Sequence, residues 1–458
     1  MLKRLYMDIQ SSRELLSQLK FCVFDLETTG GNQKTDSIIE IGLVRIENLQ
    51  IVDKRNYLIK PDVKIPEFIQ KLTTIREEDV KDAPQIEEVI QEILTFMDDC
   101  ILVAHNVSFD VPFFNSVLQR LNLPTLTNRS MCTNLMTKYL IPNLLNTNLN
   151  FMSRIFEIGH KKAHRALDDA MACAQLLQTY MGIFIEKGIT KVNHLYYPRN
   201  KYELDRSHFK KGEHNIDEIL ERISRPRCAY LFTLKGPKGI ILSSIPCTPG
   251  DNVKAQKQLA FIKQQLTKDN WEMASVRLFG NFTEALMHFT GIYPRVETHH
   301  RGEIIQFLTE LHCQKSGLSK KGKNMSEEQL IAWNEQNVGD FLVTTHLVPD
   351  QMIVVPVLAF SPKNLLIFRY PGHQKKLLQF MNSRADKLLS MRNKSLLMQG
   401  PLREFYFDYL EQCLQSDQSG VILFKKNIPQ KDPEKFFETL NDFLAKNPNA
   451  HRYPKQYI

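Results

Sequence analysis

The chain has no apolar run long enough to cross a membrane and no apolar signal core at its start. A membrane span needs about 18 consecutive apolar residues, and no stretch of the 458 residues approaches that length. Residues 1–8 read MLKRLYMD, which lacks the apolar core of a secretion signal. We therefore expect a protein that is neither exported nor membrane-bound, and we expect it in the cytoplasm.

Cysteines are few and scattered. None of the eight falls in a Cys-x-x-Cys pair, which argues against a zinc ribbon and against a disulfide framework. Such usage fits a reducing compartment. The eight positions are Cys22, Cys100, Cys132, Cys173, Cys228, Cys247, Cys313 and Cys413.

The charge balance is uneven along the chain. Residues 1–182 carry 20 Lys/Arg and 23 Asp/Glu, whereas the remainder carries 39 basic and 28 acidic residues. An acidic first part and a basic second part suit a metal-carboxylate site that acts on a polyanion such as nucleic acid. A basic surface with no partner is the alternative. The length and the 43% apolar content predict two to four folded domains.

The stretch at residues 21–30, FCVFDLETTG, ends an apolar run in two acids and a turn. Phe, Cys and Val favour a buried strand. Side chains alternate along a strand, so Asp25 and Glu27 point to the same face. Two adjacent carboxylates repel each other unless a cation or proton lies between them. The stretch therefore predicts a divalent-metal site, with a solvated acidic turn as the alternative.

Two later stretches supply more acids and a histidine. Residues 105–110, HNVSFD, follow a predicted buried strand at 100–104, and Asp110 is expected to open a helix, where it could serve only as an N-cap. Residues 164–169, HRALDD, lead into a helix predicted from Ala166. If His164 lay inside that helix, Asp168 would share its face better than Asp169.

The three stretches match, in order and spacing, the three motifs of the DEDDh exonucleases, the 3′-to-5′ exonucleases similar to the proofreading epsilon subunit. The resemblance covers about residues 18–182, and the segment between the first two motifs also matches except that Thr74 replaces the usual glycine. It implies an α/β domain with a ribonuclease H-like mixed sheet. It also selects Asp169 over Asp168, with His164 on the loop before the helix.

The resemblance further implies roles for these residues. Four acids would hold two Mg²⁺ or Mn²⁺ ions, His164 would accept the proton of the attacking water, and the product would be a nucleoside 5′-monophosphate. The expected metal ligands are Asp25, Glu27, Asp110 and Asp169. The expected substrate contacts are Thr28, Thr29, Asn106 and Phe109, of which Phe109 could equally belong to the core.

Local patterns predict the remaining elements of this region. Three strands at 21–28, 36–46 and 51–59 are joined by short turns, which is typical of an antiparallel meander. Helices are expected at residues 73–80, 86–97 and 151–158.

The second part of the chain carries no catalytic motif. Residues 183–226 are expected to form a linker with one helix at 216–223. Residues 227–300 resemble a GIY-YIG nuclease module in the order of their elements, but Phe289 stands where that family has its metal-binding glutamate. The resemblance therefore implies a degenerate module that binds or positions substrate. Residues 301–458 are expected to form a further α+β domain. A hairpin followed by a helix is expected there, which is the same order of elements as at residues 229–266.

We expect a metal-dependent 3′-to-5′ exonuclease that acts on DNA ends, most simply single-stranded 3′ ends, in proofreading or repair. The first alternative is a 3′-to-5′ exoribonuclease on short or structured RNA, because the same carboxylates serve both substrates. The second is a nucleic-acid-binding or polymerase-associated adaptor with weak nuclease activity. A DNA polymerase or another replication or repair protein is the expected protein partner.

Overall fold

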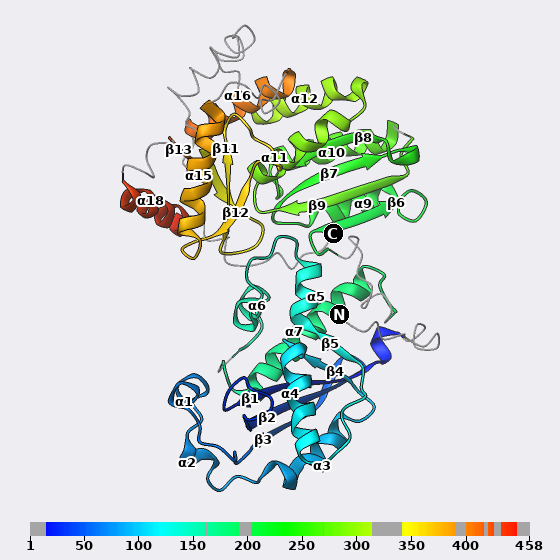
Figure 1. Ribbon diagram of the computed structural model, residues 1–458. Coiled ribbons are helices and arrows are strands. Elements are labelled where there is room, and N and C mark those ends of the chain that lie inside the picture. The colour runs from blue at the N-terminus through cyan, green and yellow to red at the C-terminus, as the bar shows by residue number, and fades with distance from the viewer. Residues whose placement is uncertain are drawn as a thin grey trace. The chain divides into compact units, whose positions relative to one another are not determined.

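The computed structural model describes residues 15–160, 163–191, 203–268, 270–313, 341–389, 400–415, 420–425 and 432–446. The chain divides into two compact units at Leu204 and Asp205, and Figure 1 labels their helices and strands.

The first unit is built on a five-stranded mixed sheet of order β3-β2-β1-β4-β5. Strands β1, β2 and β3 are antiparallel neighbours, as the meander prediction required, and β4 and β5 run parallel to β1. The strands are β1 (Lys20–Thr28), β2 (Ile38–Glu47), β3 (Gln50–Leu58), β4 (Ile101–Ala104) and β5 (Ser130–Cys132). This arrangement confirms the predicted α/β class with a mixed sheet.

Alternation along β1 and β2 separates the two faces of this sheet. Phe24 and Leu26 of β1 belong to the apolar core that helices α3 (Ile86–Met97) and α4 (Val107–Arg120) complete, and Figure 1 shows α4 over this face. The intervening residues face the long helix α7 (Ala166–Glu186), which packs on β1 and β2. Asp25 and Glu27 therefore lie on the side of the sheet that α7 covers.

Several helices of the first unit differ from their predicted bounds. The helix predicted at 73–80 is wrong, because Thr74 adopts a left-handed backbone with φ 61° that ends one helix before a second begins. Thr74 is the residue that replaces the usual glycine, and a left-handed backbone is what favours glycine there. The helix expected to open at Asp110 instead begins at Val107. The remaining helices are η2 (Leu16–Gln18), α1 (Glu67–Thr73), α2 (Glu77–Val80), α5 (Thr133–Leu140) and α6 (Leu149–Ile155).

The second unit contains two four-stranded antiparallel sheets. The first has the order β6-β9-β7-β8, with strands β6 (Arg206–Lys210), β7 (Ala229–Lys235), β8 (Ile241–Cys247) and β9 (Met273–Phe279). Its helices are α9 (Ile216–Ser224), η4 (Pro237–Gly239), α10 (Val253–Lys268), α11 (Phe282–Ile292), η5 (Tyr293–Arg295) and α12 (Thr298–His312). Strand β6 and helix α9 lie within the expected linker range and belong to this unit.

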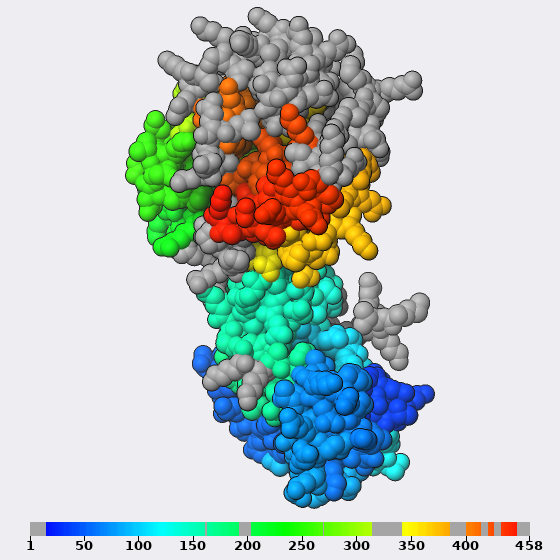
Figure 2. All heavy atoms as spheres, turned by 90° about the vertical axis from the view of Figure 1, so that its left-hand side faces the viewer, coloured from blue at the N-terminus to red at the C-terminus, as the bar shows by residue number. Residues whose placement is uncertain are grey.

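The second sheet has the order β12-β11-β10-β13. Its strands are β10 (Phe341–Thr345), β11 (Gln351–Pro356), β12 (Leu366–Arg369) and β13 (Val421–Phe424), and its helices are α15 (Gln374–Leu389), α16 (Pro401–Gln415) and α18 (Pro433–Lys446). Helix α18 lies at the surface on the face shown in Figure 2 and buries Phe436, Leu440 and Phe443 in the core of this sheet.

The two sheets of the second unit differ in connectivity. In the first, the hairpin β7-β8 is followed by helix α10, and β9 then returns to pair antiparallel with β7. In the second, strand β12 follows β11 and pairs with it before helix α15, and β13 later pairs antiparallel with β10. The hairpin-then-helix order expected from the sequence is therefore present in β11, β12 and α15, but the strand pairing around it is not the same. At the positions compared with the GIY-YIG module, Tyr230 and Phe289 are both buried in the core.

Among the described residues, no helix combines the length and apolarity that crossing a membrane would require.

Candidate active site

Strand β1 carries two acids on the face toward α7. Asp25 lies opposite Gly42 of β2 and Glu27 lies opposite Glu40. Glu27 is buried and Asp25 is half-buried. The apolar run before them places these acids inside the fold.

Helix α4 brings a third acid to the same strand. Asp110 lies in the first turn of α4 and is buried. Its carboxylate accepts hydrogen bonds from its own backbone N–H and from the N–H of Leu26, the residue between the two acids of β1. The helix N-cap is Asn106, so Asp110 is not the capping residue that the sequence left as an alternative.

The start of α7 supplies the fourth acid and the histidine. His164 precedes the helix with a left-handed φ of 62°, and its N–H donates to Asp169 Oδ2 at 3.2 Å. Ligand-type atoms of Glu27, His164 and Asp169 all lie within 4.8 Å of one another. His164 is exposed and lies on the loop before the helix, which is the placement that favours Asp169 over Asp168.

The four carboxylates act on one another electrostatically. Burial, and then the charges of Asp110, Asp169 and Glu27, raise the pKa of Asp25 well above its ordinary value. Burial and the neighbouring acids raise the pKa of Glu27 to about 8, and burial raises the pKa of Asp110 to about 7. Burial also raises the pKa of Asp169, against the hydrogen bond from His160.

Such a cluster of oxygen donors fits hard divalent cations. Mg²⁺ and Mn²⁺ prefer carboxylate and water oxygens. Carboxylates whose pKa values are raised by mutual repulsion regain their charged form when cations neutralise them. The residues present therefore fit divalent metal ions.

A buried ion pair fixes the loop that carries His164. Glu40 is 1% exposed and accepts hydrogen bonds from Arg165 Nε at 3.0 Å and Nη2 at 2.8 Å, and from Ala166 N at 3.0 Å. Asn56 Nδ2 donates to it at 2.8 Å. Although burial opposes it, these hydrogen bonds hold the pKa of Glu40 below its ordinary value. The start of α7 is thereby tied to strand β2.

Close backbone contact at Gly42 reinforces this tie. A Cβ built on Gly42 would lie 2.3 Å from the carbonyl carbon and oxygen of Ala166 and 2.4 Å from the N of Leu167. Any larger residue would push the start of α7 away from β2, and with it Asp169 and His164.

A second histidine, which the sequence reasoning missed, contacts the site. His160 Nε2 lies 2.5 Å from Asp169 Oδ1, and both side chains are largely buried. His160 precedes the third motif by four residues, and nothing in the local pattern distinguished it from a solvated loop residue.

The four predicted substrate contacts have different surroundings. Thr28 Oγ1 donates to the carbonyl of Gly30 at 2.7 Å, and Thr29 Oγ1 accepts from Ser37 N at 3.0 Å, so both hydroxyls hold the turn after β1. Asn106 is exposed. Phe109 is half-buried and packs against the core beside Phe113, with ring centroids 5.6 Å apart. Contact with substrate remains a prediction for all four.

Comparison with known proteins matches part of the first unit to an exonuclease family and parts of the chain to longer relatives. The family model described as "Exonuclease" matches residues 22–177. A "DNA polymerase III PolC-type" from Caldanaerobacter subterraneus subsp. tengcongensis is 35% identical over 253 residues, 52% of this chain and 18% of the relative. A "3'-5' exonuclease DinG" from Staphylococcus epidermidis is 34% identical over 188 residues, 41% of this chain and 21% of the relative. The chain thus spans about a fifth of the length of these two curated relatives.

Solved structures similar to part of the chain are also nucleases. "Exonuclease X in complex with 5' overhanging duplex DNA" is 26% identical, with a TM-score of 0.30, and the match covers 37% of this chain and 93% of that one. The nuclease domain of 3'hExo, described as a DEDDh family member bound to rAMP, is 20% identical, with a TM-score of 0.32 and the same two coverages.

Proposed function

We propose that this chain, in which residues 22–177 form a DEDDh-type exonuclease domain, removes nucleotides one at a time from the 3′ ends of DNA. The observation that carries the proposal is the convergence of acids from β1, α4 and α7 with His164 beside Glu27 and Asp169.

Each residue has a role that follows from its place. Asp25, Glu27, Asp110 and Asp169 would hold two Mg²⁺ or Mn²⁺ ions. Ions so held, when bound, stabilise the charge that develops on the attacking and leaving oxygens of a phosphodiester. His164 is exposed and lies next to the acids, where it can accept the proton of an attacking water. Glu40 and Gly42 position His164 and Asp169, as their contacts with the start of α7 indicate.

DNA is the substrate that we infer, in proofreading or repair. Support comes from the curated relatives, one named a DNA polymerase III and the other a 3′-to-5′ exonuclease. On the same grounds we propose a DNA polymerase or another replication or repair protein as the partner. The cysteines, for which the structure shows no disulfide, fit the cytoplasm, where we place the protein.

Digestion of matched DNA and RNA oligomers tests this function. Single strands of one sequence, labelled at the 5′ end, are incubated with the full chain in Mg²⁺ or Mn²⁺. We expect a ladder that shortens from the 3′ end of DNA with release of nucleoside 5′-monophosphates. Faster loss of the RNA strand would show that RNA is the preferred substrate. No shortening of either strand would refute the nuclease proposal.

Two variants connect the activity to the site. Asp110→Asn keeps the shape of the side chain but removes an acid, and His164→Ala removes the proton acceptor. Both should abolish most of the digestion while binding of the DNA strand, measured in Ca²⁺ by fluorescence anisotropy, stays close to that of the unmodified protein. Full digestion by Asp110→Asn would show that the activity comes from elsewhere.

A further inference from the structure

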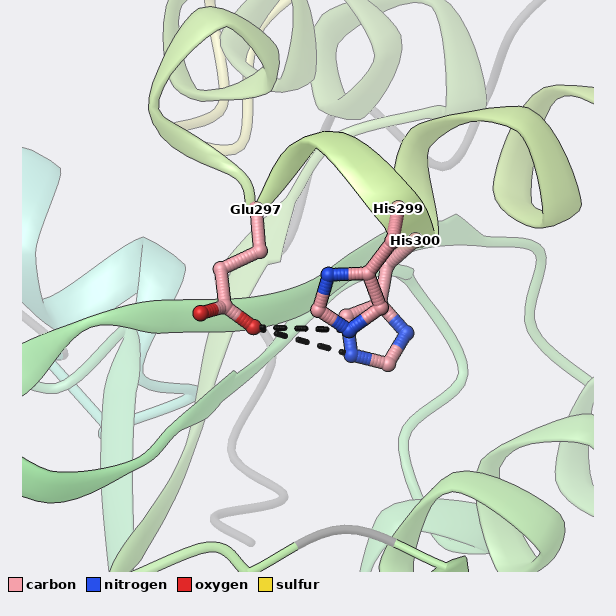
Figure 3. Close-up of side chains that lie close together, drawn as sticks. All are labelled: Glu297, His299 and His300. Atoms are coloured by element: carbon pink, nitrogen blue, oxygen red, sulfur yellow. Dashed lines mark ion pairs between the residues drawn. The ribbon is translucent and has the colours of Figure 1, made fainter.

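Outside the exonuclease site, one glutamate and two histidines point at each other on the second unit. Glu297 immediately precedes α12, and His299 and His300 lie in its first turn. Their ligand-type atoms all lie within 4.8 Å of one another. Figure 3 shows both imidazole rings turned toward one carboxylate oxygen of Glu297. We propose that these three residues bind one divalent transition-metal ion of the Zn²⁺ class.

The distances suit a small tetrahedral ion. Glu297 Oε2 lies 3.6 Å from His299 Nε2 and 3.8 Å from His300 Nε2. An ion with bonds of about 2.0–2.1 Å in tetrahedral geometry holds its ligand atoms about 3.4 Å apart. Both glutamate-histidine distances are therefore within about half an ångström of this spacing, and the ligand atoms of His299 and His300 lie within 4.8 Å of each other.

The backbone beneath the three side chains is fixed on both sides. Val296 forms a β-bridge with Ile241, and Glu297 N donates to Ile241 O at 3.0 Å. Arg301 donates from Nε to Val296 O and from Nη2 to Pro294 O, each at 2.8 Å. A site held by packed backbone loses little freedom when it binds.

The carboxylate of Glu297 is not used for capping. Glu297 is the N-cap residue of α12, yet its side chain makes no capping hydrogen bond, and His300 N donates instead to the Glu297 backbone carbonyl at 3.1 Å. The carboxylate faces the two imidazole rings. A cation shared by the three side chains would require the Glu297 carboxylate to point in this direction.

The donor set separates this site from the acidic one in the first unit. Two imidazole nitrogens and one carboxylate suit Zn²⁺, Cu²⁺, Ni²⁺ or Co²⁺ better than Mg²⁺, which prefers oxygen. Exposure also rises across the cluster, from 12% for the side chain of His300 to 34% for Glu297 and 70% for His299. Three protein ligands on an open side leave a fourth position for water or another donor.

Zn²⁺ titration of the full chain by isothermal calorimetry tests the proposal. The protein is first stripped with chelator and then held in excess Mg²⁺, which occupies the acidic site. We expect one Zn²⁺ per chain, with an affinity that falls at least about 100-fold in His300→Gln and in His299→Gln, since even partners of a metal ligand contribute about 10–100-fold. Circular dichroism confirms that each variant folds.

Two control variants make the outcome specific. His214 pairs with Glu218 at 3.1 Å on the same unit, so His214→Gln removes a glutamate-paired histidine and should leave the Zn²⁺ site intact. Asp110→Asn should also keep it, which separates this proposal from the exonuclease function. Equal Zn²⁺ binding by the unmodified protein and His300→Gln, or no Zn²⁺ bound in excess Mg²⁺, would overturn the proposal and leave a helix-end ion pair.

Discussion

At the scale of single residues, the exonuclease site brings together carboxylates that repel one another, an arrangement that opposes folding. We attribute their presence to the binding of metal ions. Burial raises the pKa values of Asp25, Glu27 and Asp110, and repulsion by neighbouring acids raises those of Asp25 and Glu27 further. A structural role would favour amides or apolar groups at these positions. Raised carboxylate pKa values beside a histidine are typical of catalytic metal sites.

Two adjacent aspartates allow a matched test of the third motif. Asp169→Asn should reduce DNA hydrolysis about a thousandfold, because losing an oxygen ligand costs several kcal/mol of charge stabilisation. Asp168→Asn, one residue earlier on the same helix, should stay within a few-fold of the unmodified protein. Initial rates in saturating Mg²⁺ give the comparison. The reverse order of the two variants would show that Asp168 is the ligand.

The buried carboxyl group of Glu284 should make the stability of the second unit depend on pH. Burial raises its pKa to about 8, and its Oε2 accepts a hydrogen bond from Gly280 N at 2.7 Å. Its folded pKa exceeds its unfolded value of about 4.5, so the folded state binds more protons between these values. The free energy of unfolding should therefore fall by about 2 kcal/mol from pH 6 to pH 8.

Urea unfolding of the full chain at pH 6, 8 and 9, followed by tryptophan fluorescence, measures this decline. Trp271 belongs to the second unit and is buried. Glu284→Gln, which cannot ionise, should show a smaller decline between pH 6 and pH 8. An identical decline in both proteins would mean that another group titrates.

At the scale of elements, the approach of α7 to β2 sets the geometry of the site. Glu40 and Gly42 lie on the strand next to the acids, and both contact the segment that begins α7. Asp169 and His164 have the correct positions only if that segment stays in place.

Gly42→Ala tests this contact. The added methyl group would meet the backbone of Ala166 and Leu167, so we expect a loss of at least about 2 kcal/mol of stability and a lower kcat. The control is Gly182→Ala on the same helix, where a Cβ meets nothing within 4 Å. The stability of that variant should equal that of the unmodified protein or exceed it by up to about 1 kcal/mol. Thermal unfolding and steady-state kinetics report both effects, and a fully active, stable Gly42→Ala would contradict the account.

Local patterns predicted the elements well where a periodic stretch decides the structure. The meander, the strand at 101–104, the start of α7 and the hairpin of β7 and β8 all follow from short-range alternation or spacing. The helix predicted at 73–80 failed because one residue, Thr74, adopts a left-handed backbone that composition alone does not reveal.

The contacts between distant residues that position the site could not be predicted from local patterns. Glu40 lies 125 residues from Arg165, and its role depends on how a strand and a helix start meet in space. The contact of His160 with Asp169 likewise depends on the fold, which brings the two side chains together. The sequence motifs predict the reacting groups, whereas the packing of distant segments determines which residues position them.

At the scale of the whole molecule, all the proposed catalytic residues belong to the first unit, and the second unit carries the basic charge. Residues 205–458 hold 35 Lys/Arg and 26 Asp/Glu. A basic unit attracts a polyanion and raises affinity in a salt-dependent way. The uneven charge along the sequence therefore coincides with the two units, and a role of the second unit in binding nucleic acid remains a prediction.

A chain shortened to residues 1–204 tests this division. It contains the five-stranded sheet, its helices and every proposed catalytic residue, so it should fold cooperatively and keep kcat within several-fold of the full chain. Its KM for DNA should rise, most clearly at low salt. Kinetics at two salt concentrations provide the measurement, and a shortened chain that folds but has lost kcat would place a catalytic group in the second unit.

The central claim is that acids from β1, α4 and α7 share two divalent cations, and counting bound Mn²⁺ tests it most directly. Mn²⁺ is titrated into the full chain in the presence of a nucleoside 5′-monophosphate and followed by electron paramagnetic resonance. We predict two ions close enough to couple magnetically in the unmodified protein and at most one uncoupled ion in Asp110→Asn. Absence of a coupled pair in the unmodified protein, or an unchanged pair in Asp110→Asn, would contradict the account.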